Sequence, residues 1–389
     1  MAGPRRPSGP GRGAPRRRPA PSSGGRPAVR RGAPAAPRTT TVEVSFLPGL
    51  GDVVADEVAE RLSFDRPPRP VPGRDDALRV DLSGPLAEVL QLRTAVAAFV
   101  VRHFDVPRPR SLTSGDHLAR LTDAVYASLR VAGSSSFRFE AAGSGSAVFA
   151  RLAQLLHEAT GLTYDPDHGE LVVRVARAYP HRPDVDPGWD VLVRIGPRPL
   201  SARRWREVDF PGAANATIAA AMSRLAGIRP DERVLNLMCG SGTLLVERLL
   251  AGPAGAAVAV DDDEEALRAA EANLRAAGLR TARLVRADAT SPTALATALE
   301  GQAFDLVLAD PPWGALHGSH ETAAAVHAGL LAAAHTVTAA GGRLVVLTHE
   351  VRVMERAVAD AAGLWTLDGP PMRVFAKGHH PRIWVLRRA

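Results

Sequence analysis

Lysine and cysteine are both nearly absent from this 389-residue chain. Lys377 is the only lysine among 48 Lys and Arg residues, so almost all of the positive charge is carried by guanidinium groups. The single cysteine, Cys239, excludes a disulfide framework and a metal site with several thiolate ligands. We therefore expect no resident metal ion.

Long apolar segments are also lacking. The longest uncharged run, residues 322–342, is mostly Ala, Thr, Gly and His, and is too weakly hydrophobic to predict a membrane span. The N-terminus has no apolar core of the kind found in secretory signals. We expect a soluble, cytoplasmic, monomeric protein without membrane contact, whose 46% hydrophobic content is enough to form buried cores.

Acidic residues are missing from the first 38 positions, which hold ten arginines. Subtracting these ten from the 48 basic residues leaves 38 against 41 acidic ones, so the formal charge of +7 comes from this segment. Its Arg-, Pro- and Gly-rich composition predicts a disordered tail over residues 1–40. Such a tail suits contacts with nucleic-acid phosphates, and it suits a role in solubility equally well.

Two small α+β units are expected next, at residues 41–110 and 111–206. In the first unit the hydrophobic patterns predict strands at 42–46, 77–82 and 97–104 and helices at 50–62 and 85–94. In the second they predict helices at 117–129 and 146–161 and strands at 136–140, 170–177 and 189–195.

The end of the second unit interleaves arginines with Trp205. We expect its arginines to contact an RNA phosphate backbone, and they are Arg198, Arg203, Arg204 and Arg206. The alternative is a set of surface arginines around a packed tryptophan.

Residues 207–389 alternate helix and strand patterns, which predicts an α/β domain with a doubly wound, mostly parallel sheet. A helix is expected at 213–226, and strands at 233–237, 256–260, 281–285, 305–308 and 343–348. Two last strands, 372–376 and 382–386, lie too close together for a crossover helix and are expected to form an antiparallel hairpin.

The tetrapeptide Asp310-Pro311-Pro312-Trp313 follows the buried strand that ends near residue 309. Ligands bind at the carboxyl ends of such strands. A nucleobase could stack on Trp313 while its exocyclic amine donates to the Asp310 carboxylate and the Pro311 carbonyl. Two acceptors on that amine would free its lone pair for attack, which is the chemistry of amino methylation. The alternative is a strand followed by a proline turn.

A glycine-containing loop, residues 236–243, joins the first strand of this domain to a helix. Gly240 and Gly242 allow a ligand to approach the backbone. A dinucleotide fingerprint would need glycine where Leu245 stands, and no phosphate loop is present. Asp261 ends the next strand, as expected for an acid that holds ribose hydroxyls, and Asp288 could accept from an adenine amine. A ligand that contains adenosine, has no phosphates and carries a carboxylate matches S-adenosylmethionine.

These motifs carry a family resemblance. Residues 210–389 resemble class I Rossmann-like methyltransferases, and residues 310–313 match the group that acts on exocyclic amines. More narrowly, residues 201–206, 211–215 and 238–243 are similar to THUMP-domain RNA methyltransferases that make N2-methylguanosine in tRNA.

The resemblance implies a ferredoxin-like unit, a THUMP unit that grips the acceptor end of tRNA, and a catalytic domain acting near the acceptor stem. It implies S-adenosylmethionine as the cofactor. The implied cofactor contacts are Asn236, Cys239, Gly240, Gly242, Thr243, Asp261, Asp288 and Asp310, and the implied catalytic residues are Asp310, Pro311, Pro312 and Trp313.

The chain departs from the family pattern in two places: the family usually has Asp-Pro where this chain has Asn236-Leu237, and more commonly Tyr or Phe where it has Trp313. A neutral amide cannot act as a carboxylate toward the positively charged cofactor. Cys239 lies in the cofactor loop and is not expected to be a nucleophile of the cytosine-C5 kind. The alternatives are methylation of an rRNA guanine, methylation of adenine N6 in RNA or DNA, and an RNA-binding module whose catalytic domain has lapsed.

Overall fold

The computed structural model describes residues 39–179, 186–312, 320–376 and 378–389. The expected disordered tail, apart from its last two residues, and Trp313 lie outside these ranges. Thr40, which the tail was expected to include, is the first residue of a strand. None of the helices within the described ranges is long and apolar enough to cross a membrane.

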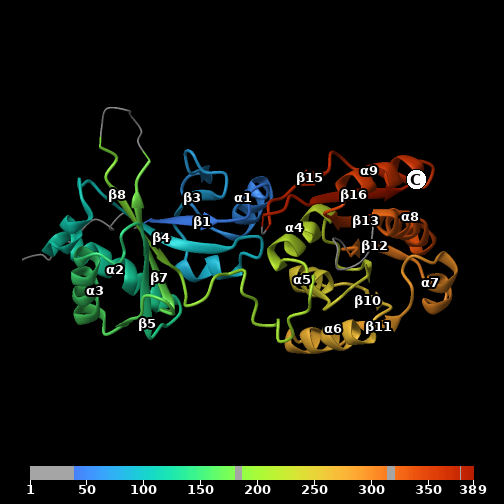
Figure 1. Ribbon diagram of the computed structural model, residues 1–389, viewed down its shortest axis with the longest axis horizontal. Helices are drawn as coiled ribbons and strands as arrows, with labels where there is room; N and C mark the ends of the chain where they lie inside the picture. The colour runs from blue at the N-terminus through green and yellow to red at the C-terminus, as the bar shows by residue number, and fades with distance from the viewer. Residues whose placement is uncertain (1–38, 180–185, 313–319, 377) are drawn as a thin grey trace, which may run out of the picture. The chain divides into compact units, whose positions relative to one another are not determined.

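The N-terminal half of the described chain is built on one eight-stranded sheet with the order β2-β3-β1-β4-β8-β7-β5-β6 (Figure 1). Its strands are β1 (Thr40–Ser45), β2 (Arg69–Pro70), β3 (Ala77–Leu82), β4 (Ala97–Phe104), β5 (Ser136–Ala141), β6 (Thr163–Tyr164), β7 (Leu171–Arg177) and β8 (Trp189–Arg194). Its helices are α1 (Gly51–Arg61), the 3-10 helices η1 (Leu86–Gln91) and η2 (Pro109–Thr113), α2 (Gly115–Val131) and α3 (Ala147–Thr160).

The two predicted α+β units share this sheet. β4 of the first unit pairs antiparallel with β8 of the second, from Phe99 opposite Arg194 to Phe104 opposite Trp189. The predicted division at residue 110 is therefore no break in the sheet. Such a pairing joins strands about 90 residues apart and leaves no mark in the hydrophobic pattern of either strand.

One predicted helix is shorter and tighter than expected. Residues 85–94 form only the 3-10 helix η1, because the backbone amides of Arg93 and Thr94 donate to the Glu57 carboxylate at 2.9 Å each instead of continuing a helix. Glu57 is buried on α1, so this contact fixes the loop before β4 to that helix.

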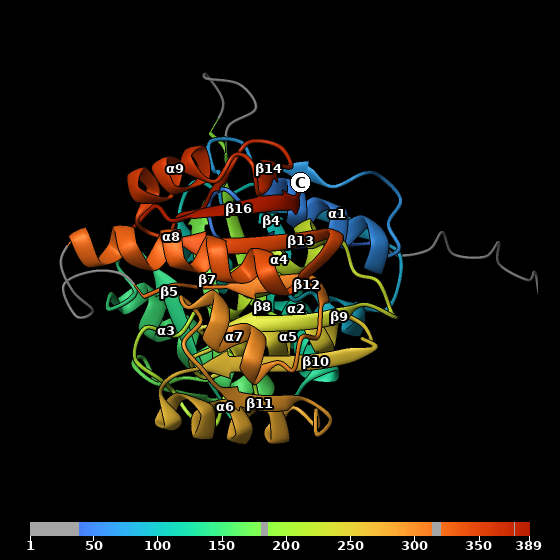
Figure 2. The same cartoon turned by 90° about the vertical axis from the view of Figure 1, so that its right-hand side faces the viewer.

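The C-terminal half is built on a second sheet with the order β11-β10-β9-β12-β13-β16-β14 (Figure 2). Its strands are β9 (Arg233–Leu237), β10 (Ala256–Asp261), β11 (Arg283–Arg286), β12 (Phe304–Ala309), β13 (Thr338–Thr348), β14 (Trp365–Leu367), β15 (Met372–Arg373) and β16 (Arg382–Arg388). Its helices are α4 (Ala216–Ala226), α5 (Thr243–Ala251), α6 (Glu264–Ala276), α7 (Pro292–Ala298), α8 (His320–Val337) and α9 (Val351–Asp360).

Helices pack on both faces of this sheet, which confirms the doubly wound α/β prediction. Val234, Leu306 and Leu308 belong to the core that includes residues of α4, α5 and α6. Leu235 and Val307, one position along, belong to the core formed with α7, α8 and α9. This alternation follows from the period of two along a strand, and it fixes which face each residue at a strand end adopts.

The expected antiparallel hairpin is present, because β15 pairs with β16. Its first strand is shorter than predicted, because the Val374 amide donates to the Pro381 carbonyl at 3.0 Å but Pro381 has no N–H to donate in return. The Phe375 amide points away from β16 and donates to the Pro48 carbonyl at 2.9 Å. The predicted helix at residue 213 starts later, because the Asn215 side chain accepts from the Thr217 amide at 2.8 Å and caps α4 there. Sequence reasoning missed β14, a three-residue strand.

Candidate active site

Three predicted site residues share one face at the carboxyl edge of the catalytic sheet. Asn236 lies beside Ala259 of β10 and Leu308 of β12, so Asp261 and Asp310, each two residues further along, point to the same face as Asn236. Their strands lie on either side of β9. At about 4.8 Å per strand, the backbones at Asp261 and Asp310 are roughly 10 Å apart. A ligand on this face would lie between two carboxylates.

The loop after β9 begins between the carboxyl ends of β10 and β12. Met238, Gly240 and Gly242 all have positive φ, of 50°, 51° and 77°. A β-carbon at Gly242 would lie 3.2 Å from the Ala270 Cβ, so the glycine lets α5 pack closely on α6. Met238 is a non-glycine residue in this region, a strain that is concentrated at functional sites. The predicted glycine loop thus forms a tight backbone turn at the sheet edge.

Asp261 fastens this loop to β10. Its Oδ2 accepts from the Gly240 amide at 2.8 Å and its Oδ1 from the Asp263 amide at 3.1 Å. Burial raises the pKa of Asp261, against the effect of these two donors. Each oxygen keeps a second lone pair, so the carboxylate can also accept from a ligand hydroxyl.

Asp288 lies two residues beyond β11 and is exposed. The Thr290 amide and hydroxyl donate to its Oδ1 at 2.8 and 2.6 Å and lower the pKa of the carboxyl. Oδ2 has no hydrogen bond within the described chain, so that oxygen is left for a ligand amine.

Asn236 is fully buried and only half satisfied. Its Nδ2 donates to the carbonyls of Leu237 and Leu308 at 3.1 and 3.2 Å, whereas its Oδ1 has no partner among the described residues. Ser241 likewise has a buried hydroxyl without a partner in the described chain. Unpaired buried acceptors at a loop edge fit a ligand that brings its own donors, such as an ammonium group.

The thiol of Cys239 is buried, and burial raises its pKa well above the ordinary value. A protonated thiol is a poor nucleophile. This agrees with the prediction that Cys239 contributes to the loop and not to covalent chemistry. Thr243 is also buried and starts α5, where its hydroxyl accepts from Arg206 at 3.1 Å.

Asp310 follows β12 directly, and its Oδ1 is buried without a hydrogen-bond partner in the described part of the chain. Burial raises the pKa of this carboxyl to about 7. Pro311 is buried and Pro312 exposed, and neither can donate a backbone hydrogen bond. The site therefore offers a buried acceptor beside a carbonyl at the sheet edge. A carboxyl so perturbed is a candidate functional group.

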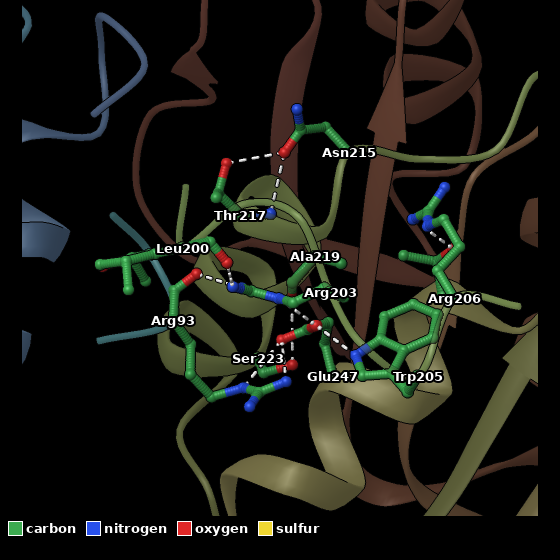
Figure 3. A network of polar contacts seen from close by, with 12 residues as sticks. Arg93, Leu200, Arg203, Trp205, Arg206, Asn215, Thr217, Ala219, Ser223 and Glu247 are labelled. Carbon is green, nitrogen blue, oxygen red and sulfur yellow. Dashed lines mark hydrogen bonds and ion pairs between the residues drawn. The ribbon is translucent and has the colours of Figure 1, made fainter. Parts of the chain in front are cut away.

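Residues 198–206, which we call the linker, were expected to contact RNA through their arginines. Part of the linker is instead buried inside the protein (Figure 3). The guanidinium of Arg203 donates to the Glu247 carboxylate of α5 at 2.9 Å, and its side chain is 8% exposed. The Trp205 indole donates to the same oxygen at 3.2 Å, and Arg93 donates to the other at 2.9 Å. Arg203 thus holds the linker to α5, and its buried position does not support a phosphate contact.

Arg206 is also engaged, since it donates to the Ala214 carbonyl at 2.9 Å as well as to Thr243. Arg198 and Arg204 are exposed, and neither forms an ion pair with a described residue. Their role as phosphate contacts stays a prediction. Sequence reasoning missed Glu247, although an acid directly after Leu244, Leu245 and Val246 was a usable signal.

Within the described chain, no group of three or more His, Cys, Asp or Glu side chains could hold a metal ion.

Comparison with known proteins identifies relatives of this chain. Residues 203–380 match a family described as RMKL-like, methyltransferase domain. The chain is 30% identical over 359 residues to the tRNA (guanine(6)-N2)-methyltransferase of Thermus thermophilus, an alignment covering 89% of this chain and 99% of that one. It is 26% identical over 140 residues to a tRNA (guanine(10)-N2)-dimethyltransferase of Methanothermobacter thermautotrophicus, covering 36% and 39%. The crystal structure of TrmN from Thermus thermophilus superposes with a TM-score of 0.69 at 28% identity, covering 90% and 100%.

Proposed function

Since the chain belongs to the S-adenosylmethionine-dependent methyltransferase family that includes the tRNA (guanine(6)-N2)-methyltransferase of Thermus thermophilus, we propose that it methylates the exocyclic N2 amine of a guanosine in tRNA. The observation that carries the proposal is the buried Asp310 carboxyl at the sheet edge, next to the glycine loop. The target nucleotide lies in the acceptor-stem region in this proposal.

The residues around the loop fit S-adenosylmethionine. Asp261 would hold the ribose hydroxyls and Asp288 the adenine amine, while the backbone at Gly240 and Gly242 permits close approach. The unpaired Oδ1 of Asn236 would accept from the ammonium, by a hydrogen bond without the charge attraction of a carboxylate. When bound, the cofactor supplies an electrophilic methyl group.

Asp310 and Pro311 act on the amine. The Asp310 carboxylate and the Pro311 carbonyl accept the two N–H hydrogens, which orients the nitrogen lone pair and opposes its delocalisation into the ring. The methylated nitrogen would have to lose one proton, and a carboxylate with a pKa near 7 can accept it at neutral pH. Trp313 supplies a stacking surface for the base in this proposal.

The N-terminal half would bind the tRNA and supply the free energy needed to extrude the target base. The exposed Arg198 and Arg204 of the linker would contact phosphates, and by our proposal residues 111–206 act as a THUMP-type unit on the acceptor end. Loss of one such phosphate contact weakens binding to all sequences alike.

Nucleoside analysis tests the proposal. Unmodified tRNA and rRNA transcripts are incubated with the full-length protein and isotopically labelled S-adenosylmethionine, then digested and analysed by mass spectrometry. We expect labelled N2-methylguanosine in tRNA only, mapped to the acceptor-stem region. N6-methyladenosine as the product, or methylation confined to rRNA, would contradict the proposal.

Substitution of Asp261 tests the cofactor site. We expect Asp261→Ala to weaken S-adenosylmethionine binding by about 1.5–3 kcal/mol, because a charge-assisted hydrogen bond is lost and the Gly240 amide is left without its acceptor. Isothermal titration measures the change, and tRNA affinity should stay within about twofold. Asp262→Ala, an exposed neighbour, is the matched control. Equal titration curves for Asp261→Ala and wild type would show that other residues hold the ribose.

A further inference from the structure

Residues 374–376 and 378–381, which we call the hairpin segment, leave the catalytic sheet on the same edge as Asp310. Thr348 ends β13 opposite Arg382, and Arg382 lies opposite Arg373 at the end of β15. β13 runs parallel to β12, so the chain that leaves the sheet beyond Thr348, Arg382 and Arg373 does so at the same edge as Asp310. Three strand spacings place the start of the segment roughly 15 Å from Asp310.

Backbone hydrogen bonds give the hairpin segment a defined shape. The Val374 amide donates to the Pro381 carbonyl at 3.0 Å. Ala376 and His379 exchange two further bonds, of 3.0 and 2.9 Å. Val374 is fully buried, so the base of the segment is anchored, while Phe375 and residues 378–380 are exposed.

The N-terminal half also holds this segment. The Phe375 amide donates to Pro48, as described above, and a β-carbon at Gly49 would lie only 2.1 Å from the Arg373 carbonyl oxygen. Gly49 also has a φ of +96°. Only glycine permits this approach, so the turn after β1 is fitted against the hairpin. The half of the chain proposed to bind tRNA therefore fixes a feature beside the catalytic edge.

The exposed side chains of the segment have the chemistry of an RNA-binding surface. Phe375 is 39% exposed, and its ring lies 5.2 Å from that of His380. Arg373 is exposed and forms no ion pair with any described residue. Aromatic and imidazole rings stack on unpaired bases, and a guanidinium pairs with phosphate.

We propose that Phe375 and His380 stack on the nucleotide next to the target guanosine while Arg373 contacts its phosphate. This rests on the proposed function and extends it. Extrusion of a guanosine deprives the adjacent base of a stacking partner, and a ring beside the catalytic edge can replace it. The hairpin segment thus lowers the free energy of the flipped state, and the turn at Gly49 keeps it in position.

Substitution of Phe375 tests the stacking surface. We expect Phe375→Ala to lower kcat/KM for tRNA by about 5- to 150-fold, the range for loss of one base-stacking ring. Phe375→Trp should restore most of the activity. Titration with S-adenosylmethionine should give the wild-type affinity for both variants. The matched control is Leu367→Ala: Leu367 is 41% exposed but lies level with Leu344, in the middle of β13 and away from its carboxyl end, so its loss should change kcat/KM by less than twofold.

A modified substrate separates stacking from a general effect on the fold. The same assay uses tRNA with an abasic residue beside the guanosine that the wild-type protein methylates. Wild type and Phe375→Ala should then differ by less than about twofold, because no base is left to stack. An equal loss on intact and abasic tRNA, or no loss on either, would overturn this inference. Absence of N2-methylguanosine from the wild-type reaction would instead reject the proposed function.

Discussion

Asp310→Ala is expected to lower the single-turnover rate of tRNA methylation by about two orders of magnitude or more, as when a hydrogen-bond partner of a transition state is lost. Asp310 provides one of two acceptors for the amine, and the buried position of its Oδ1 strengthens that interaction. Binding of S-adenosylmethionine should stay close to wild type, because Asp261 and the glycine loop are untouched. A variant with near wild-type turnover would rule out the assigned role.

The pH dependence follows from the same carboxyl. Burial raises its pKa to about 7, so the free protein carries a protonated Asp310 in acid and an ionised one above neutrality. If the ionised form accepts from the amine, kcat/KM should rise with pH and level off above about 7. The residual activity of Asp310→Asn should lack this rise.

The free energy of unfolding should fall as pH rises, whereas kcat/KM should increase. The folded pKa lies above the ordinary value of 3.8, so the folded state binds more protons than the unfolded state between these two values. Stability from this group is therefore lost as pH rises from about 4 to 7. Asp310→Asn, which is neutral, should unfold at higher urea concentration than wild type at pH 8, with the difference shrinking toward zero near pH 4. Equal urea midpoints for Asp310→Asn and wild type at both pH values would show that the carboxyl is not desolvated.

The catalytic half was largely predictable because its strands contain apolar runs between turns, as in residues 256–260 of β10 and 344–347 of β13. The order of glycines and acids at strand ends then indicated the site, since parallel strands end at one edge. Pairing between distant segments was not predictable. Nothing around Arg203 indicates that its partner, Glu247, lies 44 residues away and makes it an internal residue rather than a phosphate contact.

Burial also separates arginines that look alike in the sequence. Arg203 and Arg204 are neighbours, and the first is buried while the second is exposed. Asn236 gives a related case: the sequence shows an amide in place of a carboxylate, but only the structure shows that its Nδ2 bridges β9 and β12 and leaves Oδ1 free of partners in the described chain. Local patterns fix which elements form, and tertiary contacts decide what each polar group does.

Loss of the Glu247 carboxylate should lower the stability of the protein strongly. Its side chain is completely buried, and its two oxygens accept from Arg93, Arg203 and Trp205 (Figure 3). Removal of one partner from a buried ion pair leaves uncompensated charge and costs about 3–5 kcal/mol. We therefore expect Glu247→Ala to lower the free energy of unfolding by that amount, measured as a shift in the urea midpoint.

A second ion pair between the same two halves provides the control. Glu60 of α1 accepts from Arg224 of α4 at 2.7 Å, but the Glu60 side chain is 55% exposed. Exposed pairs contribute about 0–1 kcal/mol, so Glu60→Ala should shift the midpoint little. The two variants remove the same functional group from contacts that join the same halves, and they differ in burial. Equal shifts would show that the network around Glu247 contributes no more than a surface pair, and that the linker is held to α5 by apolar packing of Trp205 alone.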